Sequence, residues 1–329
     1  MSKVPYKPTV CLVTPALADA NNGNWQTARR WTNMLAAKYT VRLLSKWDGE
    51  PADMLIALHA KKSAESIDAW SQRYPARPLV LIMTGTDLYR DIAVDSIAQR
   101  SLAQAHQIIV LQELGGLALP AAVRHKAVVC FQSAPTRRAR VKTTHHLRAL
   151  MVGHLREEKS PQTFFAAARL LTPHQEIFFD HVGAPLDPAL GAQAQRLQDE
   201  CPHYRWLGSQ THAATRERIA RAHVLVQPSR LEGGAHVVLE AVTSGTPVLA
   251  SRVDGNVGML GADYAGYFDW NDVTALAQLL KRCHKDGNFL TQLSKQCAER
   301  AFLFAPEREQ STLRNIVAEL LQDMKSHFA

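Results

Sequence analysis

Short runs of apolar residues alternate with longer segments of helical periodicity along the whole chain of 329 residues. Buried strands of parallel sheets have this short apolar pattern, and a crossover helix follows each of them. The alternation therefore predicts an α/β fold built from βαβ units, with a doubly wound sheet in each half. We expect strands at residues 9–14, 40–45, 53–58, 79–84, 107–111 and 127–131, and at 148–152, 176–181, 204–207, 224–227 and 247–250.

A polar and basic stretch, residues 133–146, interrupts this pattern and is typical of an interdomain linker. The length of the chain also suits two domains of about 150 residues each. We expect an N-terminal Rossmann-like domain at 1–140 and a second one at 141–306. A last helix at 307–329 has an apolar face and is expected to pack back on the first domain.

The composition favours a soluble cytoplasmic protein without stable membrane insertion. Apolar residues make up 46% and charged residues 21%, which are ordinary values for a globular protein. The chain has no run of roughly 20 apolar residues, as a membrane span needs, and lacks the long apolar segment of a secretory signal. The five cysteines form no Cys-x-x-Cys pair, so neither a zinc knuckle nor a disulfide framework is indicated.

The formal net charge of +8 favours an anionic partner. The basic residues are spread along the chain, and the densest run, residues 137–142, has no RNA-binding aromatic motif beside it. We therefore expect a small molecule that carries phosphate, and no nucleic acid. A basic nucleic-acid-binding or scaffold protein that retains the fold without catalysis remains the alternative.

The segment after the strand at 224–227 has the pattern of a phosphate site. Gly233, Gly234 and Ala235 precede a predicted helix, where backbone amides and the helix dipole favour a diphosphate. Glu232 and Glu240 lie eight positions apart, or about 10 Å along a helix, which is roughly the span from a sugar to a ribose across a diphosphate. An amphipathic helix with one capping and one solvated glutamate would also fit this pattern.

This segment resembles the donor-binding signature of the family 4 retaining glycosyltransferases, which is Glu-x7-Glu followed by Ala-x3-Gly-x-Pro-Val. The resemblance implies the GT-B architecture, in which two Rossmann-like domains face each other across a cleft, with Glu232 and Glu240 at the donor. The family also has a strand-end Gly-Arg-Leu-x-x-x-Lys, and here Gly153 to Lys159 read Gly-His-Leu-Arg-Glu-Glu-Lys. Lys159 matches, whereas His154 replaces the arginine.

Further residues are expected at or near the donor. Arg156 could supply the positive charge that His154 lacks, and Arg230 follows the strand at 224–227. Gly23, after the first strand, could bring backbone amides near the donor phosphate, although a single glycine is a weak signal. Ser160 and Pro161 predict a helix start, with serine as the cap and proline at the first helical position.

Further phrases, at residues 58–62, 84–91, 152–156 and 255–261, resemble the selenosugar synthases of selenoneine biosynthesis. This resemblance implies transfer of a sugar of the glucose or N-acetylglucosamine type from UDP to the selenium of selenophosphate. Enzymes of the same pathway are then possible partners. A GT-B glycosyltransferase with a conventional hydroxyl acceptor remains the alternative, with Asp87 or His59 as a base near the sugar.

Selenium in selenophosphate is already a strong nucleophile, so positioning and charge stabilisation suffice without a strong base. His59, Thr84, Gly85 and Thr86 are the residues expected with Glu232 at the reacting carbon. The residues expected to bind the acceptor anion are Lys61, Lys62, Asp87 and Arg90. A solvated helix start at Lys61 and Lys62, and a helix cap at Asp87, are the alternatives.

We expect no cofactor and no metal. The 14 histidines show neither His-x-x-x-His nor a His/Glu pair in a convincing helix, and the chain has no Asp-x-Asp motif. The charge of the leaving group would then be balanced by Lys159, Arg156 and helix amides.

Overall fold

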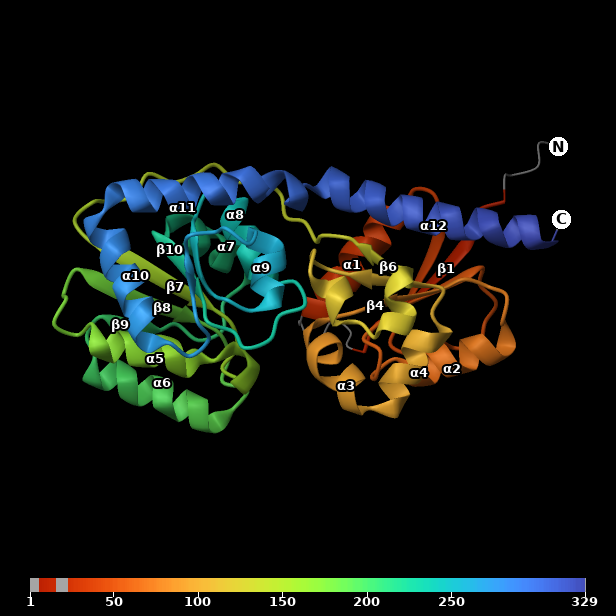
Figure 1. Ribbon diagram of the computed structural model, residues 1–329, viewed down its shortest axis with the longest axis horizontal. Helices are drawn as coiled ribbons and strands as arrows, with labels where there is room; N and C mark the ends of the chain where they lie inside the picture. Colours follow the sequence, from red (N-terminus) through yellow and green to blue (C-terminus); the bar gives the residue numbers. More distant parts are fainter. Residues whose placement is uncertain (1–5, 16–22, 329) are drawn as a thin grey trace. The chain divides into compact units, whose positions relative to one another are not determined.

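The computed structural model describes residues 6–15 and 23–328. The chain divides into two compact α/β units, coloured from red to yellow and from green to blue apart from the C-terminal helix (Figure 1). Unit 1 comprises Met1–Gln132 and Pro306–Ala329, and unit 2 comprises Ser133–Ala305.

Unit 1 contains a parallel sheet with the strand order β2-β1-β3-β4-β5-β6. Its strands are β1 (Thr9–Val13), β2 (Thr40–Leu44), β3 (Met54–Leu58), β4 (Leu79–Ile82), β5 (Gln107–Val110) and β6 (Ala127–Val129). Successive side chains of a strand point to opposite faces, so both faces of a buried strand must be apolar. Accordingly, Val10 and Leu12 of β1 belong to one core, whereas Cys11 and Val13 belong to the other.

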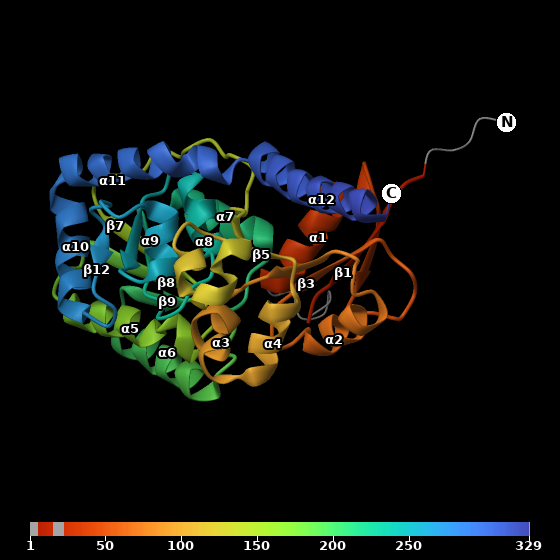
Figure 2. The ribbon, with the colours of Figure 1, turned by 45° about the vertical axis from the view of Figure 1, so that its right-hand side comes forward.

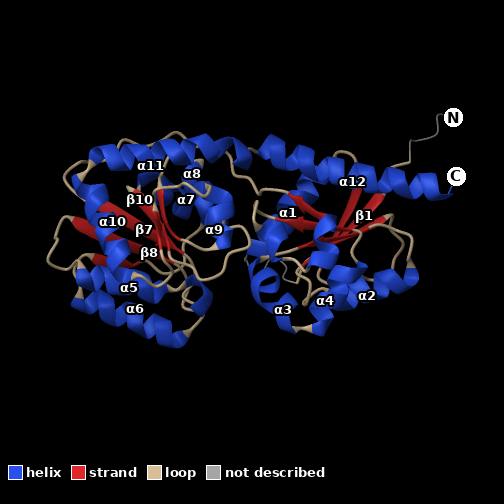
Figure 3. Ribbon diagram, viewed as in Figure 1, coloured by secondary structure: helices blue, strands red, loops and turns tan. Residues whose placement is uncertain are grey.

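Helices cover both faces of this sheet (Figures 1 and 3). On one face lie α1 (Gly23–Ala36) and α12 (Pro306–Phe328), and on the other α2 (Ala64–Arg73) and α4 (Ser96–Gln104), with the short α3 (Ile92–Val94) before α4. Four residues of α12, Leu313, Ile316, Val317 and Leu321, are buried in the core that α1 shares. The terminal helix is thus part of unit 1.

Unit 2 contains a second parallel sheet, with the order β12-β11-β10-β7-β8-β9. Its strands are β7 (Leu147–Val152), β8 (Ile177–Val182), β9 (Tyr204–Trp206), β10 (Val224–Gln227), β11 (Val248–Ser251) and β12 (Tyr267–Phe268). Every strand expected from the sequence is present to within two residues at each end. Among the strands of the described residues, β12 alone is missing from the prediction, because a run of two residues has no visible periodicity.

Helices also lie on both faces of this sheet (Figures 2 and 3). One face carries α5 (Pro161–Leu170), α6 (Pro188–Glu200) and α10 (Val273–Lys285). The other carries α7 (His212–Arg221), α8 (His236–Val242), α9 (Asp254–Leu260) and α11 (Gly287–Arg300). In the part of the chain that is described, no helix has the length and apolar composition needed to cross a bilayer.

The polar stretch between the two sheets packs on unit 2. The amide of Ala134 donates to the carbonyl of Phe304 at 3.2 Å, and the amide of Arg137 donates to that of Thr243 at 2.9 Å. Backbone hydrogen bonds of this kind give a segment without periodicity a fixed place. The division between the units therefore falls after Gln132, whereas the sequence places it near residue 140.

Candidate functional site

The sheet of unit 2 reverses its winding between β7 and β10. From β7 the chain continues outward to β8 and β9, and from β10 it continues to β11 and β12 on the opposite side. Ligands of doubly wound sheets bind outside the carboxyl ends of the strands at such a switch point. The loops after β7 and β10 are therefore the first place to search for a site.

An ion pair joins these two loops. Lys159, which follows β7, places its Nζ 2.7 Å from Oε1 of Glu232, which follows β10. The same oxygen accepts a hydrogen bond of 2.6 Å from Nε2 of Gln227, the last residue of β10. Glu232 is only 7% exposed. The structure thus brings together two residues expected at the donor, and it adds Gln227, which the motif did not indicate.

Close backbone contacts fix the same loops. A Cβ atom on Gly255, at the start of α9, would lie 1.8 Å from the carbonyl oxygen of Glu232. A Cβ on Gly183, after β8, would lie 1.9 Å from the carbonyl oxygen of Gly153. Only glycine allows such an approach, so these two residues set the positions of the loops at the switch point.

Glu240 lies on α8 and is surrounded by basic groups. Its Oε1 lies 2.6 Å from Nε2 of His212, 3.6 Å from Nε2 of His236 and 3.9 Å from a guanidinium nitrogen of Arg216. Burial alone would raise the pKa of Glu240, but the hydrogen bond from His212 and the charges of His236, His212 and Arg216 lower it below its ordinary value. Glu240 is therefore a buried carboxylate that stays ionised.

The expectation that no His/Glu pair lies on a helix is wrong, since His236 and Glu240 are four residues apart on α8. Their spacing was visible in the sequence. His212 and Arg216 were missed because α7 precedes the motif and its approach to Glu240 depends on the fold.

The turn before α8 contains Gly233, Gly234 and Ala235, and a helix follows it, as the sequence predicts. Gly233 and Ala235 are buried and Gly234 is partly buried, and the helix begins at His236 with Ala235 as its N-cap residue. The helix is short, with seven residues. This turn directly follows Glu232, so it belongs to the loop at the switch point.

His154 lies at the position of the family's arginine but does not supply the positive charge of that arginine. Its Nδ1 accepts a hydrogen bond of 3.1 Å from the amide of Ala184. Burial lowers the pKa of His154, and the charges of Arg156 and Lys159 lower it further. Arg156 is exposed, so it is the residue of this loop that can offer a permanent charge beside Lys159.

Arg230 is held next to the same loop. Its amide donates to the carbonyl of Glu158 at 2.9 Å, and its guanidinium carbon lies 5.1 Å from the centre of the Trp270 ring. Trp270 in turn donates from Nε1 to Oγ of Ser160 at 3.0 Å. The prediction that the Ser160 side chain caps α5 is wrong, because its backbone is left-handed, with φ 46°, and its hydroxyl makes no capping bond. Pro161 does begin the helix.

In unit 1, His59 follows β3 in a strained conformation. Its φ of 74° lies in the left-handed region, which is uncommon for a histidine, and the residue is only 2% exposed. Its Nε2 lies 3.2 Å from Oγ1 of Thr86. Burial lowers the pKa of His59, and the nearby carboxylate of Asp87 opposes this only in part. His59 is thus a buried, neutral histidine at the carboxyl edge of the sheet.

Asp87 joins the loops that follow β3 and β4. Its Oδ1 accepts hydrogen bonds from the amide and the hydroxyl of Thr84, at 2.8 and 2.7 Å. Its Oδ2 accepts one from the amide of Ala60 at 3.0 Å. Asp87 is fully buried and begins a π-helical turn, Asp87–Asp91, a feature often found at functional sites. These contacts give Asp87 a structural role, and its contact with an acceptor stays a prediction.

The expected anion-binding cations lie around this edge. Nζ of Lys61 is 2.7 Å from Oδ2 of Asp95, and Nε of Arg90 is 3.2 Å from Oδ1 of Asp91. The exposed Lys62 donates from its amide to Nδ1 of His59 at 3.4 Å. Gly85 is partly buried between Thr84 and Thr86.

Gly23 is the first residue of α1, and a Cβ there would meet no atom within 4 Å. Residues 16–22, which precede it, lie outside the described residues.

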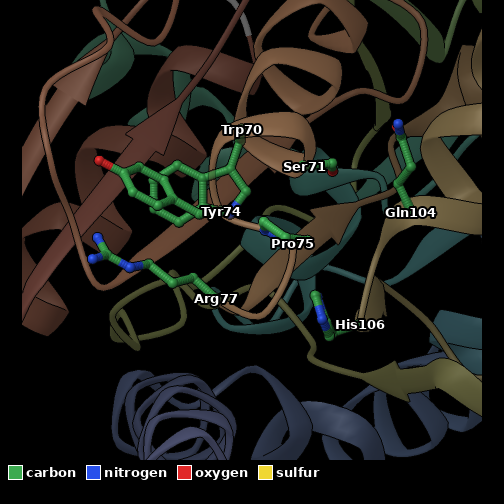
Figure 4. Close-up of a pocket in the computed structure, with 7 residues that line it drawn as sticks. All are labelled: Trp70, Ser71, Tyr74, Pro75, Arg77, Gln104 and His106. Atoms are coloured by element: carbon green, nitrogen blue, oxygen red, sulfur yellow. The ribbon is translucent and has the colours of Figure 1, made fainter.

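A cavity in unit 1 lies away from these residues (Figure 4). Its volume is about 200 Å³, and it is lined by Trp70, Ser71, Tyr74, Pro75, Arg77, Gln104 and His106. Arg77 precedes β4 and His106 precedes β5, so the cavity is at the amino edge of the sheet. His59 and Asp87 are at the carboxyl edge, where ligands of such sheets bind.

Three solved structures have similar folds at low sequence identity. Sucrose-phosphate synthase from Thermosynechococcus elongatus matches with a TM-score of 0.78 and 16% identity, over 97% of this chain and 100% of its own. HepE from Anabaena, solved in complex with UDP-glucose, has a TM-score of 0.77 and 12% identity, over 95% and 100%. The pneumococcal O-GlcNAc transferase GtfA, in complex with UDP and GlcNAc, has 0.65 and 15%, over 82% and 57%. No curated protein sequence matches this chain.

The fold and these likenesses define the class: the chain has the GT-B fold of two Rossmann-like domains, which confirms the fold expected from the sequence. The family model for glycosyl transferases group 1 matches residues 133–304, more than half of the chain. The chain therefore belongs to this family and is a glycosyltransferase.

Proposed function

We propose that this glycosyltransferase moves a sugar of the glucose or N-acetylglucosamine type from UDP to the selenium of selenophosphate, and so provides a selenosugar for selenoneine biosynthesis. The observation that carries the donor half is the group Lys159, Glu232 and Glu240 around the switch point of unit 2. The acceptor half is supported by the resemblance of the phrases at residues 58–62 and 84–91, and by the cations found there.

The donor is held by the residues of unit 2. Lys159 and Arg156 face the diphosphate, and the amides of Gly233, Gly234 and Ala235 add donors to it. Glu240 accepts hydrogen bonds from the ribose hydroxyls, because it is ionised and buried. Glu232 accepts hydrogen bonds from Lys159 and Gln227 in the structure, and in the complex with the donor its carboxylate accepts from the sugar hydroxyls. Two structures with a similar fold contain UDP-glucose or UDP with a sugar, which supports a UDP-linked donor.

The acceptor is an anion, and unit 1 offers cations for it. Lys61, Lys62 and Arg90 bind its phosphate oxygens, while His59, Thr84 and Thr86 orient the selenium. The selenium lone pair forms the bond to the sugar C1, and the bond from C1 to the UDP oxygen breaks, so that UDP leaves with the electron pair. Hydrolysis of the phosphorus–selenium bond then frees the selenosugar. The chemistry needs no metal, because Lys159, Arg156 and backbone amides offset the charge of UDP.

A hydroxyl acceptor is the second candidate, and one observation favours it. His59 is buried and neutral at neutral pH, and Nδ1, which accepts from the amide of Lys62, is the ring nitrogen with the lone pair. A neutral histidine can accept a proton from an alcohol, which selenophosphate does not require.

Product analysis separates the two candidates. The protein is incubated with UDP-glucose or UDP-N-acetylglucosamine together with fresh selenophosphate or simple alcohols, in the presence of a chelator, and the products are identified by mass spectrometry. We expect a sugar product with the isotope pattern of selenium, and no loss of turnover with the chelator. Alcohol glycosides without any selenium product would refute the selenophosphate proposal.

The acceptor site has a direct test. The double variant Lys61→Gln/Arg90→Gln should raise the apparent KM for selenophosphate, whereas the affinity for UDP should stay nearly constant, since the donor residues belong to unit 2. Lys38→Gln, an exposed lysine of unit 1 outside the site, is the control. Unchanged selenophosphate kinetics in the double variant would remove these cations from the acceptor site.

A further inference from the structure

Three potential metal ligands meet at Glu240. The imidazole nitrogens of His212 and His236 and a carboxylate oxygen of Glu240 all lie within 4.8 Å of one another. Oε1 of Glu240 is 2.6 Å from Nε2 of His212 and 3.6 Å from Nε2 of His236. In a tetrahedral site with metal bonds of about 2.0–2.2 Å, neighbouring ligand atoms are roughly 3.3–3.6 Å apart. Shifts of about 1 Å would therefore convert this cluster into such a site.

The placement of the three side chains suits an ion that enters from solvent. His236 and Glu240 lie one turn apart on α8, so the helix holds them on the same side. The side chain of His212, at the start of α7, is 66% exposed, which leaves its ring free to adjust and leaves the site accessible. Two histidines and one glutamate leave a fourth position for water, as in several zinc sites.

The charges around the cluster limit its affinity. Glu240 offers a carboxylate oxygen to a cation, but Arg216 has a guanidinium nitrogen 3.9 Å from that oxygen. A divalent ion must bind next to this positive charge. We therefore expect weaker binding than in a site of the same three ligands without an arginine.

We propose that His212, His236 and Glu240 bind a divalent transition-metal ion of the zinc type, and that this ion and the donor ribose exclude each other because both use Glu240. The metal is thus an inhibitor of the transferase, not a part of its chemistry. The exclusion rests on the proposed role of Glu240 at the ribose, whereas metal binding itself does not.

Cobalt(II) tests the metal site without any enzymatic readout. Tetrahedral cobalt absorbs strongly in the visible range, so titration of the full-length, chelator-treated protein reports both affinity and geometry. The variant His212→Asn/His236→Asn should weaken cobalt binding by more than about 100-fold. Removal of a group that only hydrogen-bonds to a metal ligand already lowers metal affinity by about 10- to 100-fold, and this variant removes two ligands. His145→Asn/His146→Asn, two histidines of the same unit outside the cluster, should bind like the original protein. No tetrahedral band, or the same band in His212→Asn/His236→Asn, would overturn the site.

The exclusion is tested by adding UDP to the cobalt-loaded protein. We expect the visible band to disappear, and we expect zinc to raise the apparent KM for the UDP-sugar without lowering kcat. The single variant His236→Asn should reduce both effects, which guards against a double variant that fails to fold. A band that persists in saturating UDP would overturn the exclusion. Failure of the proposed function has a different signature, namely normal cobalt binding by a protein that binds no UDP.

Discussion

The two buried glutamates of the donor motif differ in their partners. Glu232 is held by Lys159 and Gln227, whereas Glu240 is held by His212 and Arg216. A carboxylate that already has charged partners is ordered before a ligand arrives, so less side-chain entropy is lost on binding. The cost is that a ligand must replace these contacts with equally good ones.

Replacement of Glu240 tests its role at the ribose. In Glu240→Ala, loss of a charge-assisted hydrogen bond of about 1.5–3 kcal/mol should weaken UDP binding by about 10- to 150-fold. Titration calorimetry with UDP, in the presence of a chelator, measures this directly. Glu217→Ala is the control, because Glu217 lies on α7 and pairs with Arg140 and Arg221 at the surface. If the folded Glu240→Ala variant bound UDP normally, Glu240 would have no contact with the nucleotide.

At the residue scale, the sequence predicted which two carboxylates belong to the motif but not which side chains surround them. The Glu-x7-Glu spacing is a local property of a turn and one helix, so it can be read directly. Gln227 and His212 reach these glutamates from other elements, and only the fold determines which elements meet. The strain at His59 is likewise invisible, since no pattern in the sequence marks a left-handed histidine.

Among the elements, α9 is placed by one glycine. Because a Cβ on Gly255 would lie 1.8 Å from the carbonyl oxygen of Glu232, Gly255→Ala must displace either the helix or the loop. We expect a loss of stability of about 1–3 kcal/mol and weaker UDP binding. Denaturant unfolding and calorimetry measure the two effects.

Gly287→Ala is the matched control, since a Cβ on Gly287 at the start of α11 would meet no atom within 4 Å. The positional argument requires that Gly255→Ala affect UDP binding and Gly287→Ala not. Equal effects of both substitutions would leave only a general loss of stability.

His181 on β8 hydrogen-bonds to residues of the neighbouring β7 and β9 segments. The stability of unit 2 should therefore depend on whether His181 is protonated. Its Nε2 donates to the carbonyl of Gly153 after β7 at 3.1 Å, and its Nδ1 accepts from the hydroxyl of Tyr204 on β9 at 3.2 Å. Burial lowers the pKa of His181 from 6.5 to about 4. Between these values the unfolded chain binds a proton that the folded one does not, so stability decreases as the pH falls from 6.5 to 4.

The size of this contribution follows from the shift in pKa. About 2.5 units correspond to about 3 kcal/mol. The free energy of unfolding of unit 2, measured with denaturant from pH 7 to pH 4, should fall less steeply in His181→Gln than in the original protein. Identical slopes would show that the pKa of His181 is the same in the folded and unfolded states.

The prediction of elements succeeded where strands are long and buried on both faces. Strands such as β3, with five buried residues, have a strong apolar signal. β12 has two residues and is held by pairing with β11, which is a tertiary effect. The same reason explains the linker, whose hydrogen bonds to Phe304 and Thr243 have no counterpart in local sequence.

For the molecule as a whole, the last helix completes the first unit. Glu309 on α12 is 1% exposed and binds Nε and a terminal nitrogen of Arg30, at 2.8 and 2.9 Å, and Nε1 of Trp31 at 2.6 Å. Glu309→Ala would leave these donors without their acceptor, at a cost of about 3 kcal/mol.

Hydrogen exchange of α1 measures this cost within unit 1, since its amides should exchange faster in Glu309→Ala. Glu307→Ala, which replaces an exposed glutamate two residues earlier on α12, should leave the exchange unchanged. Normal protection of α1 in Glu309→Ala would mean that the apolar contacts of α12 suffice.

The contact between Glu309 and Trp31 spans 278 residues of sequence. During synthesis, the whole of unit 2 is translated between the two parts of unit 1, which takes roughly 9–35 s at ribosomal rates of about 5–20 residues per second. Unit 2 is continuous and can fold in that time, whereas the part of the unit 1 core that α12 covers stays incomplete until this helix is made. The first unit to leave the ribosome is thus the last to be completed, and its unfinished core is a surface for chaperones and for aggregation.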